Sequence, residues 1–274
     1  MNRRKQPSPT FDFYYAALFQ DRWLTLKAAL EAPVQSIPFE NNLRKPYFLN
    51  VASYLAARVL GEIGNQEALD LCAAPGGKTL ILSSTLGPEG SLTSNEWSSQ
   101  RRNRLKRVLE EHLPPEKLKQ VRVTGYDATR WGLHKPNSYD LVLLDVPCSS
   151  ERHLMEKPAH LERWTPNRTR RLSQQAYAML LSALMTARVG GKVLYCTCAL
   201  SPLENDGVVE RVLIRKTNEV KLVSIQLPKD AESVQGEPTR YGIQILPDTS
   251  QGAGPLYLSL LEKISSSKKD QAAG

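Results

Sequence analysis

Residues 68–79 read ALDLCAAPGGKT, a short apolar run followed by a loop of two alanines, a proline and two glycines. The apolar run predicts a buried strand, and a helix is predicted to begin at Gly77. Small residues allow a ligand to approach the backbone closely, and a helix N-terminus offers it free N–H groups. The stretch therefore predicts a strand, a ligand-binding loop and a helix rather than a simple turn.

Two nucleotide-binding motifs are similar to this loop but do not match it. Gly77-Lys78-Thr79 ends like a phosphate loop, but that motif needs a glycine five residues before its second glycine. Cys72 occupies that position, and the glycine spacing also differs from GxGxxG. We therefore expect a ligand other than a nucleotide held by its phosphates.

Strand and helix patterns alternate along the rest of the chain. Strands are predicted at 91–95, 120–126, 139–146, 192–197, 220–225 and 255–263, and helices at 98–112, from Thr165, and from a capping box at Ser201–Glu204. This order predicts a doubly wound, mostly parallel α/β sheet. Such sheets bind ligands beyond the carboxyl ends of their strands.

Acidic residues stand at three of these strand ends. Glu96 is placed to reach ribose hydroxyls, Asp127 an adenine edge, and Asp145 the reactive end of a bound ligand. Each could singly be a solvated surface acid. Together at successive strand ends they predict a nucleoside site.

Two cysteine motifs close neighbouring predicted strands. Cys148 follows Asp145-Val146-Pro147, and Cys198 follows Tyr195-Cys196-Thr197. We expect Cys148 and Cys198 to face one cleft, with Cys196 in the core. The helix predicted from Ser201 would lower the pKa of the Cys198 thiol. The alternative is that both thiols are buried and inert.

This set of groups fits methylation of cytosine at C5. That carbon is a poor nucleophile until a thiolate adds to C6. An acid near N3, here Asp145, then offsets the charge that develops on the ring.

The motifs together resemble the Fmu/Sun-type family of RNA cytosine-C5 methyltransferases, in its short members without an appended RNA-binding domain. The matching pieces are DLCAAPGGKT, NE at 95–96, YD at 126–127, DVPCSS and YCTCALSPLEND, within residues 70–206. The resemblance implies a class I S-adenosylmethionine-dependent methyltransferase fold with a seven-stranded sheet and an antiparallel final strand. Cys196, Ala199 and Ser150 depart from the family's usual serines and glycine.

The resemblance also implies roles for individual residues. Cys198 would be the nucleophile, Cys148 would assist product release, and Asp145 would act in catalysis. The residues implied to contact S-adenosylmethionine are Cys72, Ala73, Ala74, Pro75, Gly76, Gly77, Lys78, Glu96, Arg101, Asp127 and Asp145.

We expect residues 1–45 to form a helical N-terminal extension, 46–264 the catalytic domain, and 265–274 a disordered tail. The extension contains one predicted helix near residues 12–30. Its aromatic side chains are expected to pack on the main domain, with stacking on RNA as the alternative.

Composition favours an anionic partner. The 274 residues include 36 Lys and Arg against 28 Asp and Glu, a formal charge of +8. Two basic clusters, at 101–107 and 152–171, are candidates to contact RNA phosphates, and the second is favoured because it follows a catalytic strand end. The first has a solvated helix face as its alternative, while Trp164 is expected to pack and His153 could stack on a base.

The four cysteines lack zinc spacing, so no metal is expected, and no apolar stretch is long enough for a membrane. The N-terminus lacks the apolar segment of a secretory signal. We predict a monomeric cytoplasmic protein, with a mitochondrial location left open.

The substrate is predicted to be ribosomal RNA, with tRNA next. Two other functions stay open. One is a DNA cytosine methyltransferase, in which Cys148 would attack. The other is a ribosome-assembly factor that binds cofactor and RNA with little catalysis.

Overall fold

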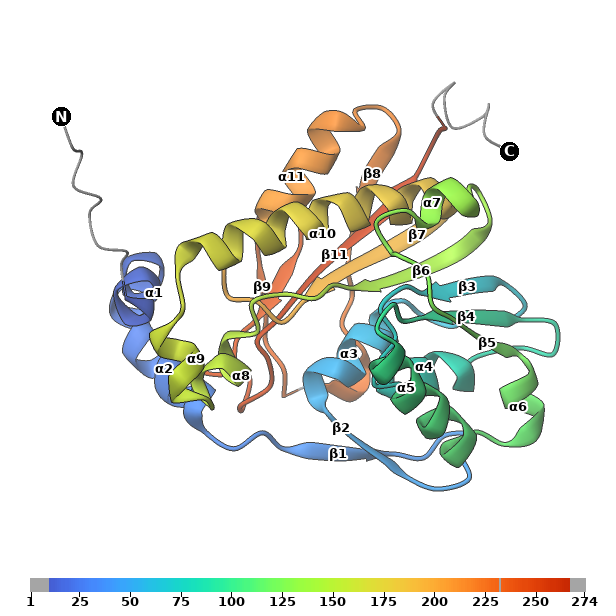
Figure 1. Cartoon of the computed structure of the whole chain (residues 1–274), viewed down its shortest axis with the longest axis horizontal. Helices are drawn as coiled ribbons and strands as arrows, with labels where there is room; N and C mark the ends of the chain where they lie inside the picture. The colour runs from blue at the N-terminus through green and yellow to red at the C-terminus, as the bar shows by residue number, and fades with distance from the viewer. Residues whose placement is uncertain (1–9, 232, 267–274) are drawn as a thin grey trace.

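The computed structural model describes residues 10–231 and 233–266. A nine-stranded sheet runs through these residues in the order β5-β4-β3-β6-β7-β11-β10-β9, and β8 pairs with β11 (Figure 1). The parallel strands are β3 (Glu67–Asp70), β4 (Ser91–Asn95), β5 (Val121–Thr124), β6 (Tyr139–Asp145) and β7 (Ala187–Thr197). The strand order reverses between β3 and β6, which is where such sheets open a ligand site.

The antiparallel part of the sheet is larger than predicted. The expected final strand is β11 (Leu256–Lys263), antiparallel to β7, with β8 (Val220–Val223) antiparallel to it in turn. Two short strands, β9 (Gly236–Pro238) and β10 (Ile243–Ile245), extend the sheet beyond the predicted seven. Strands of three residues carry too little alternation to be recognised from sequence.

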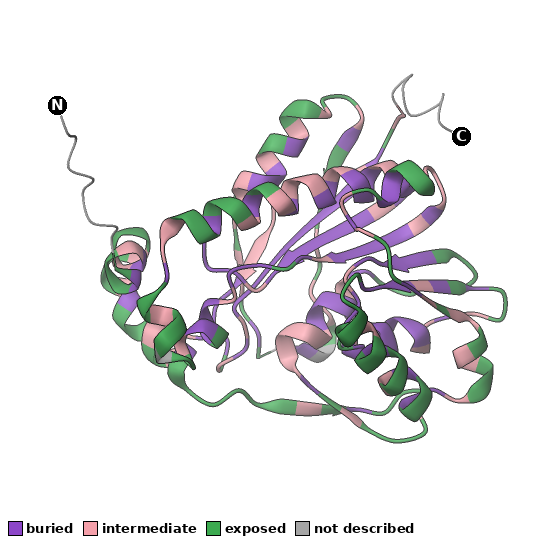
Figure 2. Ribbon diagram, in the orientation of Figure 1, coloured by how far each residue is buried: buried purple, intermediate pink, exposed green. Residues whose placement is uncertain are grey.

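Helices cover both faces of the sheet. On one face lie α3 (Val51–Val59), α4 (Gly77–Ser84) and α5 (Ser99–His112); on the other lie α7 (Trp131–His134), α10 (Pro166–Thr186) and α11 (Asp206–Arg215) (Figure 1). Along β6, Leu141 and Leu143 join the first core, while Val142 and Leu144 join the second. This alternation is the period of a strand buried on both faces, as Figure 2 shows for the central strands. The short helix α6 (Pro115–Lys119) leads into β5.

The N-terminal segment forms two helices rather than the predicted one. Gln20, with a φ of 52°, interrupts the helix between α1 (Phe11–Phe19) and α2 (Trp23–Glu31), where a 3-10 turn (Gln20–Arg22) intervenes. Phe11, Tyr15 and Trp23 pack in one buried cluster with Trp164. Packing is therefore the role of these side chains, as expected.

A hairpin of β1 (Ser36–Phe39) and β2 (Tyr47–Asn50) precedes α3. Two short helices, α8 (Glu151–Met155) and α9 (Pro158–Glu162), follow β6, and a second 3-10 turn (Lys229–Ala231) precedes β9. The division into three domains stays a prediction, and residues 267–274 of the expected tail lie outside the described residues.

The prediction of a helix that begins at Ser201 was wrong. α11 begins at Asp206, and residues 202–205 form a turn. Glu204 does not cap a helix, because its buried carboxyl group instead contacts Ser149. The side chain of Asn205 bridges Thr197 Oγ1 at 2.7 Å and the carbonyl of Ala199 at 3.0 Å. A non-local partner thus takes the Glu204 carboxyl group that a capping box would need.

Candidate active site

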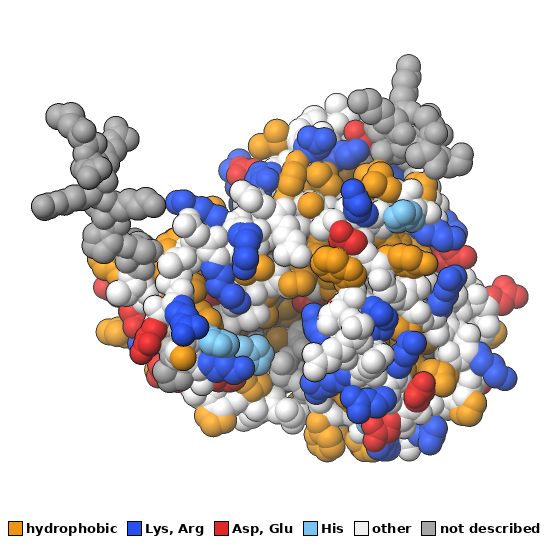
Figure 3. Space-filling model, in the orientation of Figure 1, with side chains coloured by type: hydrophobic (Ala, Val, Ile, Leu, Met, Phe, Trp, Pro, Cys, Tyr) orange, Lys and Arg blue, Asp and Glu red, His pale blue; other side chains and the backbone are white. Residues whose placement is uncertain are grey.

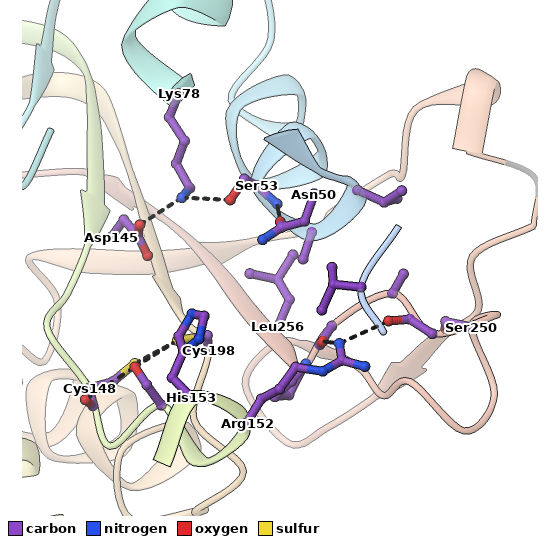
Figure 4. A pocket seen from close by; sticks show the side chains of 18 of the residues that line it. Asn50, Ser53, Lys78, Asp145, Cys148, Arg152, His153, Cys198, Ser250 and Leu256 are labelled. Atoms are coloured by element: carbon purple, nitrogen blue, oxygen red, sulfur yellow. Dashed lines mark hydrogen bonds and ion pairs between the residues drawn. The ribbon is translucent and has the colours of Figure 1, made fainter. Parts of the chain in front are cut away.

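A cavity of about 460 Å³ opens at the carboxyl ends of β3, β6 and β7. Seven predicted site residues line it: Cys72, Ala74, Lys78, Arg101, Asp145, Cys148 and Cys198 (Figure 4). Its opposite wall comes from Val34 and Gln35, from the start of α3, and from residues 250–256. Ala73, Pro75 and Gly77 line a smaller pocket of about 40 Å³ beside Lys78 and Asp145. Sequence reasoning missed the opposite wall because no motif marks it.

The glycine loop has the geometry of a cradle. Gly76 has a φ of 121°, and a Cβ atom there would lie 3.0 Å from Val108 Cγ1. A Cβ at Gly77 would lie 2.8 Å from the ring of Tyr47. Only glycine therefore fits at these two positions without displacing a neighbour.

The buried carboxyl of Asp70 lies directly below this loop. Its Oδ2 accepts a hydrogen bond from Thr79 Oγ1 at 2.7 Å, while its Oδ1 has no partner. Burial raises the pKa of Asp70 to about 7. An orphaned buried oxygen beside a glycine cradle is what a ligand carrying a hydrogen-bond donor or a positive charge would satisfy.

An ion pair links the loop to the end of β6. Lys78 Nζ lies 2.8 Å from Asp145 Oδ2 and 3.3 Å from Ser53 Oγ (Figure 4). Burial opposes the charged form of Lys78, but Asp145 outweighs it and raises the lysine pKa. Lys78 therefore stays charged and holds the Asp145 carboxylate at the cavity wall.

Two of the three acids predicted to form the nucleoside site, Glu96 and Asp127, lie outside the lining of the cavity. Glu96 Oε1 accepts from Ser98 N at 2.9 Å, and its Oε2 lies 3.3 Å from Arg101 Nη1. Arg101 Nη2 in turn donates to the carbonyl of Ala74 at 2.9 Å. Asp127 accepts from the backbone and hydroxyl of Thr129. Arg101 thus connects Glu96 to the glycine loop.

Asn95 was not singled out from the sequence, although it holds three strand ends together. Its Nδ2 donates to the carbonyls of Leu71 and Tyr126, at 3.2 and 2.9 Å. Its Oδ1 accepts from Tyr126 N at 2.8 Å and from Thr124 Oγ1 at 3.0 Å. The feature that marks Asn95 as important is a buried side-chain amide with all its hydrogen bonds made, and this feature is visible only in the folded structure.

The two cysteines meet as predicted, at the ends of adjacent strands. Cys148 Sγ and Cys198 Sγ are 3.1 Å apart as free thiols, and Ser150 Oγ lies 3.1 Å from Cys198 Sγ. The hydrogen bond from Cys148 lowers the pKa of Cys198, and the same bond raises that of Cys148. The predicted cause, a helix at Ser201, is absent. Cys196 is fully buried, as expected.

One member of the second basic cluster does not face RNA. Arg152 is 6% exposed, and it donates to the carbonyls of Ala29, Leu30, Gly252 and Gly254. These hydrogen bonds join α2 to the loop before β11. The guanidinium is therefore occupied by carbonyl oxygens and does not point to a phosphate. The prediction of a phosphate contact at Arg152 was wrong.

The comparison with known proteins starts from this geometry. Residues 57–262 match the model of the family described as 16S rRNA methyltransferase RsmB/F. The chain belongs to the RsmB/F family. The predicted Fmu/Sun-type resemblance and the class I methyltransferase fold are thereby confirmed.

Curated relatives support the same family. The chain is 36% identical over 228 residues to the mitochondrial tRNA (cytosine(34)-C(5))-methyltransferase of Danio rerio, covering 81% of this chain and 62% of that protein. It is 33% identical over 231 residues to the 5-cytosine rRNA methyltransferase NSUN4 of Mus musculus, covering 80% and 60%. The chain thus spans about three fifths of the length of these relatives.

Two solved structures share the RsmB/F fold seen here. NSun6 from Pyrococcus horikoshii with SFG, an S-adenosylmethionine analogue, has a TM-score of 0.66 at 25% identity and covers 83% of this chain and 55% of that one. A methyltransferase homolog protein from Pyrococcus horikoshii has a TM-score of 0.64 at 18% identity, covering 91% and 93%. The predicted dependence on S-adenosylmethionine agrees with both the family and the fold.

Within residues 10–231 and 233–266, no helix has the length and hydropathy of a membrane span. No group of three or more His, Cys, Asp or Glu among the described side chains is arranged to hold a metal ion.

Proposed function

We propose that this RsmB/F chain transfers a methyl group from S-adenosylmethionine to C5 of a cytosine in RNA through a covalent adduct with Cys198. The observation that carries the proposal is the contact between Cys198 and Cys148 in the cavity that also holds Asp145 and the glycine loop. A thiol with a lowered pKa is the nucleophile of such a pair, and its neighbour with a raised pKa is the proton carrier.

The residues fit the cofactor. Ala73, Pro75 and Gly77 line the small pocket beside Lys78, and the unpartnered Asp70 Oδ1 in the same pocket would accept a donor from the charged end of the cofactor. Glu96 and Asp127 are proposed to hold the nucleoside, with Arg101 bracing Glu96. When bound, S-adenosylmethionine supplies an electrophilic methyl group.

The chain's own residues supply the remaining steps. The Cys198 thiolate adds to C6 and places electron density on C5, which then takes the methyl group. Asp145, beside the charged Lys78, is proposed to take up a proton when the cytosine binds and to donate it to N3 as negative charge develops on the ring. After transfer, a base removes the C5 proton, the C5–C6 double bond forms again, and the Cys198 thiolate leaves. Cys148, in contact with Cys198, is proposed to assist this release.

Ribosomal RNA is the favoured substrate, because the family description and NSUN4 both name it. Transfer RNA is the second candidate, because another relative acts on it. The name of the tRNA-modifying relative also calls it mitochondrial, which favours a mitochondrial location over the cytoplasmic one expected from sequence. Four exposed arginines on and before α10 are proposed to contact phosphates: Arg163, Arg168, Arg170 and Arg171 (Figure 3 shows this face).

The decisive experiment compares the cysteine variants. Cys148→Ala should accumulate a covalent enzyme–RNA adduct, visible as a slow band on a denaturing gel. Cys198→Ala should form no adduct and transfer no methyl group, and the double variant should behave like Cys198→Ala, because release is irrelevant without attack.

The reverse pattern would assign attack to Cys148, as in DNA enzymes. Methyl transfer undiminished in Cys198→Ala would contradict the adduct altogether. Bisulfite comparison of RNA from cells with and without the gene would identify the methylated cytosine and decide between rRNA and tRNA.

A further inference from the structure

A buried hydrogen-bond network lies behind the two cysteines, and no step above uses it. It joins Tyr15 of α1, Ser149 after β6, Glu151 of α8 and Glu204 before α11. Glu151 is 0% exposed and Glu204 1% exposed. Two carboxyl groups enclosed together must be compensated by hydrogen bonds or by a proton.

Glu151 receives hydrogen bonds on both of its oxygens. Tyr15 Oη donates to Oε1 at 2.5 Å, and Leu200 N donates to Oε2 at 3.0 Å. Ser149 Oγ also contacts Oε1. Burial raises the pKa of Tyr15 well above its usual value, so its hydroxyl stays protonated. Glu151 is therefore surrounded by donors, the environment of an ionised carboxylate.

Ser149 has a single hydroxyl hydrogen for two carboxyl neighbours. Its Oγ lies 2.5 Å from Glu204 Oε1 and also contacts Glu151 Oε1. Its backbone N–H donates to Glu204 Oε2 at 2.8 Å. If the hydroxyl donates to Glu151, the contact with Glu204 Oε1 needs a hydrogen from Glu204 itself.

We propose that Glu204 carries a proton below neutral pH and donates it to Ser149 Oγ, so that Glu204 and Glu151 act as positioning residues for the two cysteine loops. Ser149 stands between Cys148 and Ser150, both of which contact Cys198 Sγ. Leu200, bonded to Glu151, stands two residues after Cys198. The link to methyl transfer rests on the proposed function, whereas the location of the proton does not.

Some groups around Glu204 raise the pKa of its carboxyl group and others lower it. Burial, and then the neighbouring charge of Glu151, raise its pKa to about 7, while the two hydrogen bonds with Ser149 and the exposed Arg168 of α10 oppose the shift. Tyr195 of β7 donates to the backbone carbonyl of Glu204 at 2.5 Å, not to its carboxyl group. The network is thus complete below neutral pH and loses its shared proton as pH rises.

Replacing each glutamate by glutamine separates the two roles. In Glu204→Gln the amide nitrogen can donate to Ser149 Oγ while the amide oxygen accepts from Ser149 N. In Glu151→Gln an amide nitrogen at the Oε2 position faces the backbone N–H of Leu200, and one at the Oε1 position deprives the Tyr15 hydroxyl of its acceptor. We expect the melting temperature of E204Q to stay within about 2 °C of the native value and that of E151Q to fall by roughly 5–10 °C. The opposite ranking would place the proton on Glu151 and overturn the assignment.

A second measurement decides the question even if E151Q does not fold. Infrared difference spectra of the native protein against E204Q should show a protonated carboxyl band at about pH 5 that disappears by about pH 9. No such band at the lower pH would overturn the proposal.

The positioning role is read from the alkylation rate of Cys198, followed by mass spectrometry. Native protein and E204Q should react equally below neutral pH and diverge above it, because only the native network loses a proton. Identical rates throughout would refute positioning. Neither measurement uses RNA or cofactor, so each keeps its meaning if methyl transfer is absent.

Discussion

The glycine loop and the cysteine loops are both parts of one cavity, but they are built over very different distances along the chain. Asp70 and Thr79, which bond each other below the glycine loop, are nine residues apart. Behind the cysteines, Tyr15 and Glu151 are 136 residues apart, and Ser149 and Glu204 are 55 apart. The glycine loop is therefore a local structure set on a strand end, whereas the loops that carry Cys148 and Cys198 are held only once distant segments have packed.

The largest effect should come from removing the long-range tie of Arg152. Arg152→Met leaves buried carbonyls of α2 and of the loop before β11 without a donor. We expect a loss of roughly 3–4 kcal/mol in the free energy of unfolding, measured by urea denaturation. The matched control is Arg163→Met, an exposed arginine, which should change stability by less than about 0.5 kcal/mol. Equal effects would mean that the Arg152 contacts stabilise nothing.

The glycine loop should show its own pH dependence through Asp70. Its pKa is raised from 3.8 to about 7, so the folded state holds the proton over a range where the unfolded state has lost it. The contribution of Asp70 to the free energy of unfolding is therefore fully present below about pH 4 and is lost as pH rises toward 7. In Asp70→Asn this pH-dependent loss of stability should be smaller by about 2–3 kcal/mol, measured by denaturation curves recorded without cofactor. A parallel pH profile in the variant would show that Asp70 is ionised throughout.

Glu96 is proposed to hold the nucleoside end of the cofactor. Glu96→Ala should weaken binding of S-adenosylhomocysteine by about 1–3 kcal/mol in calorimetry, because it removes a charged acceptor and releases Arg101. Glu110→Ala, an exposed residue of α5, is the control and should bind normally. Unchanged affinity in Glu96→Ala would remove this residue from the site.

The smallest effect concerns the RNA surface, which neither region contains. Charge reversal at Arg168 and Arg170 should weaken RNA binding about tenfold and reduce the salt slope by roughly 2. The same reversal at Arg104 and Arg107, exposed on α5, tests the other basic cluster. If only the reversal at Arg104 and Arg107 changes the salt slope, the RNA phosphates lie over α5.

The sequence predictions were accurate in both regions where strand order or a local motif decides the position of a residue. The loop of residues 70–79, the contact of Cys148 with Cys198 and the burial of Cys196 were all foreseen, because strand order places strand ends together. The helix at Ser201 was wrong, because Glu204 has a better partner in Ser149 than in its own backbone. Arg152 was misread for a similar reason, since its acceptors lie about 100 or more residues away.

By itself, the sequence determined the sheet, the glycine cradle and the pair of thiols, because these depend on local periodicity and on residues at strand ends. Only the tertiary structure decided how the thiols are held, and it showed that the hydrogen bond from Cys148, not a helix, lowers the pKa of Cys198. The loops that carry the thiols are held by buried groups from three separate segments: Tyr15 of α1, Glu151 and Arg152 of α8, and Glu204 before α11. Their energies come from desolvation and from hydrogen-bond partners that no local pattern encodes.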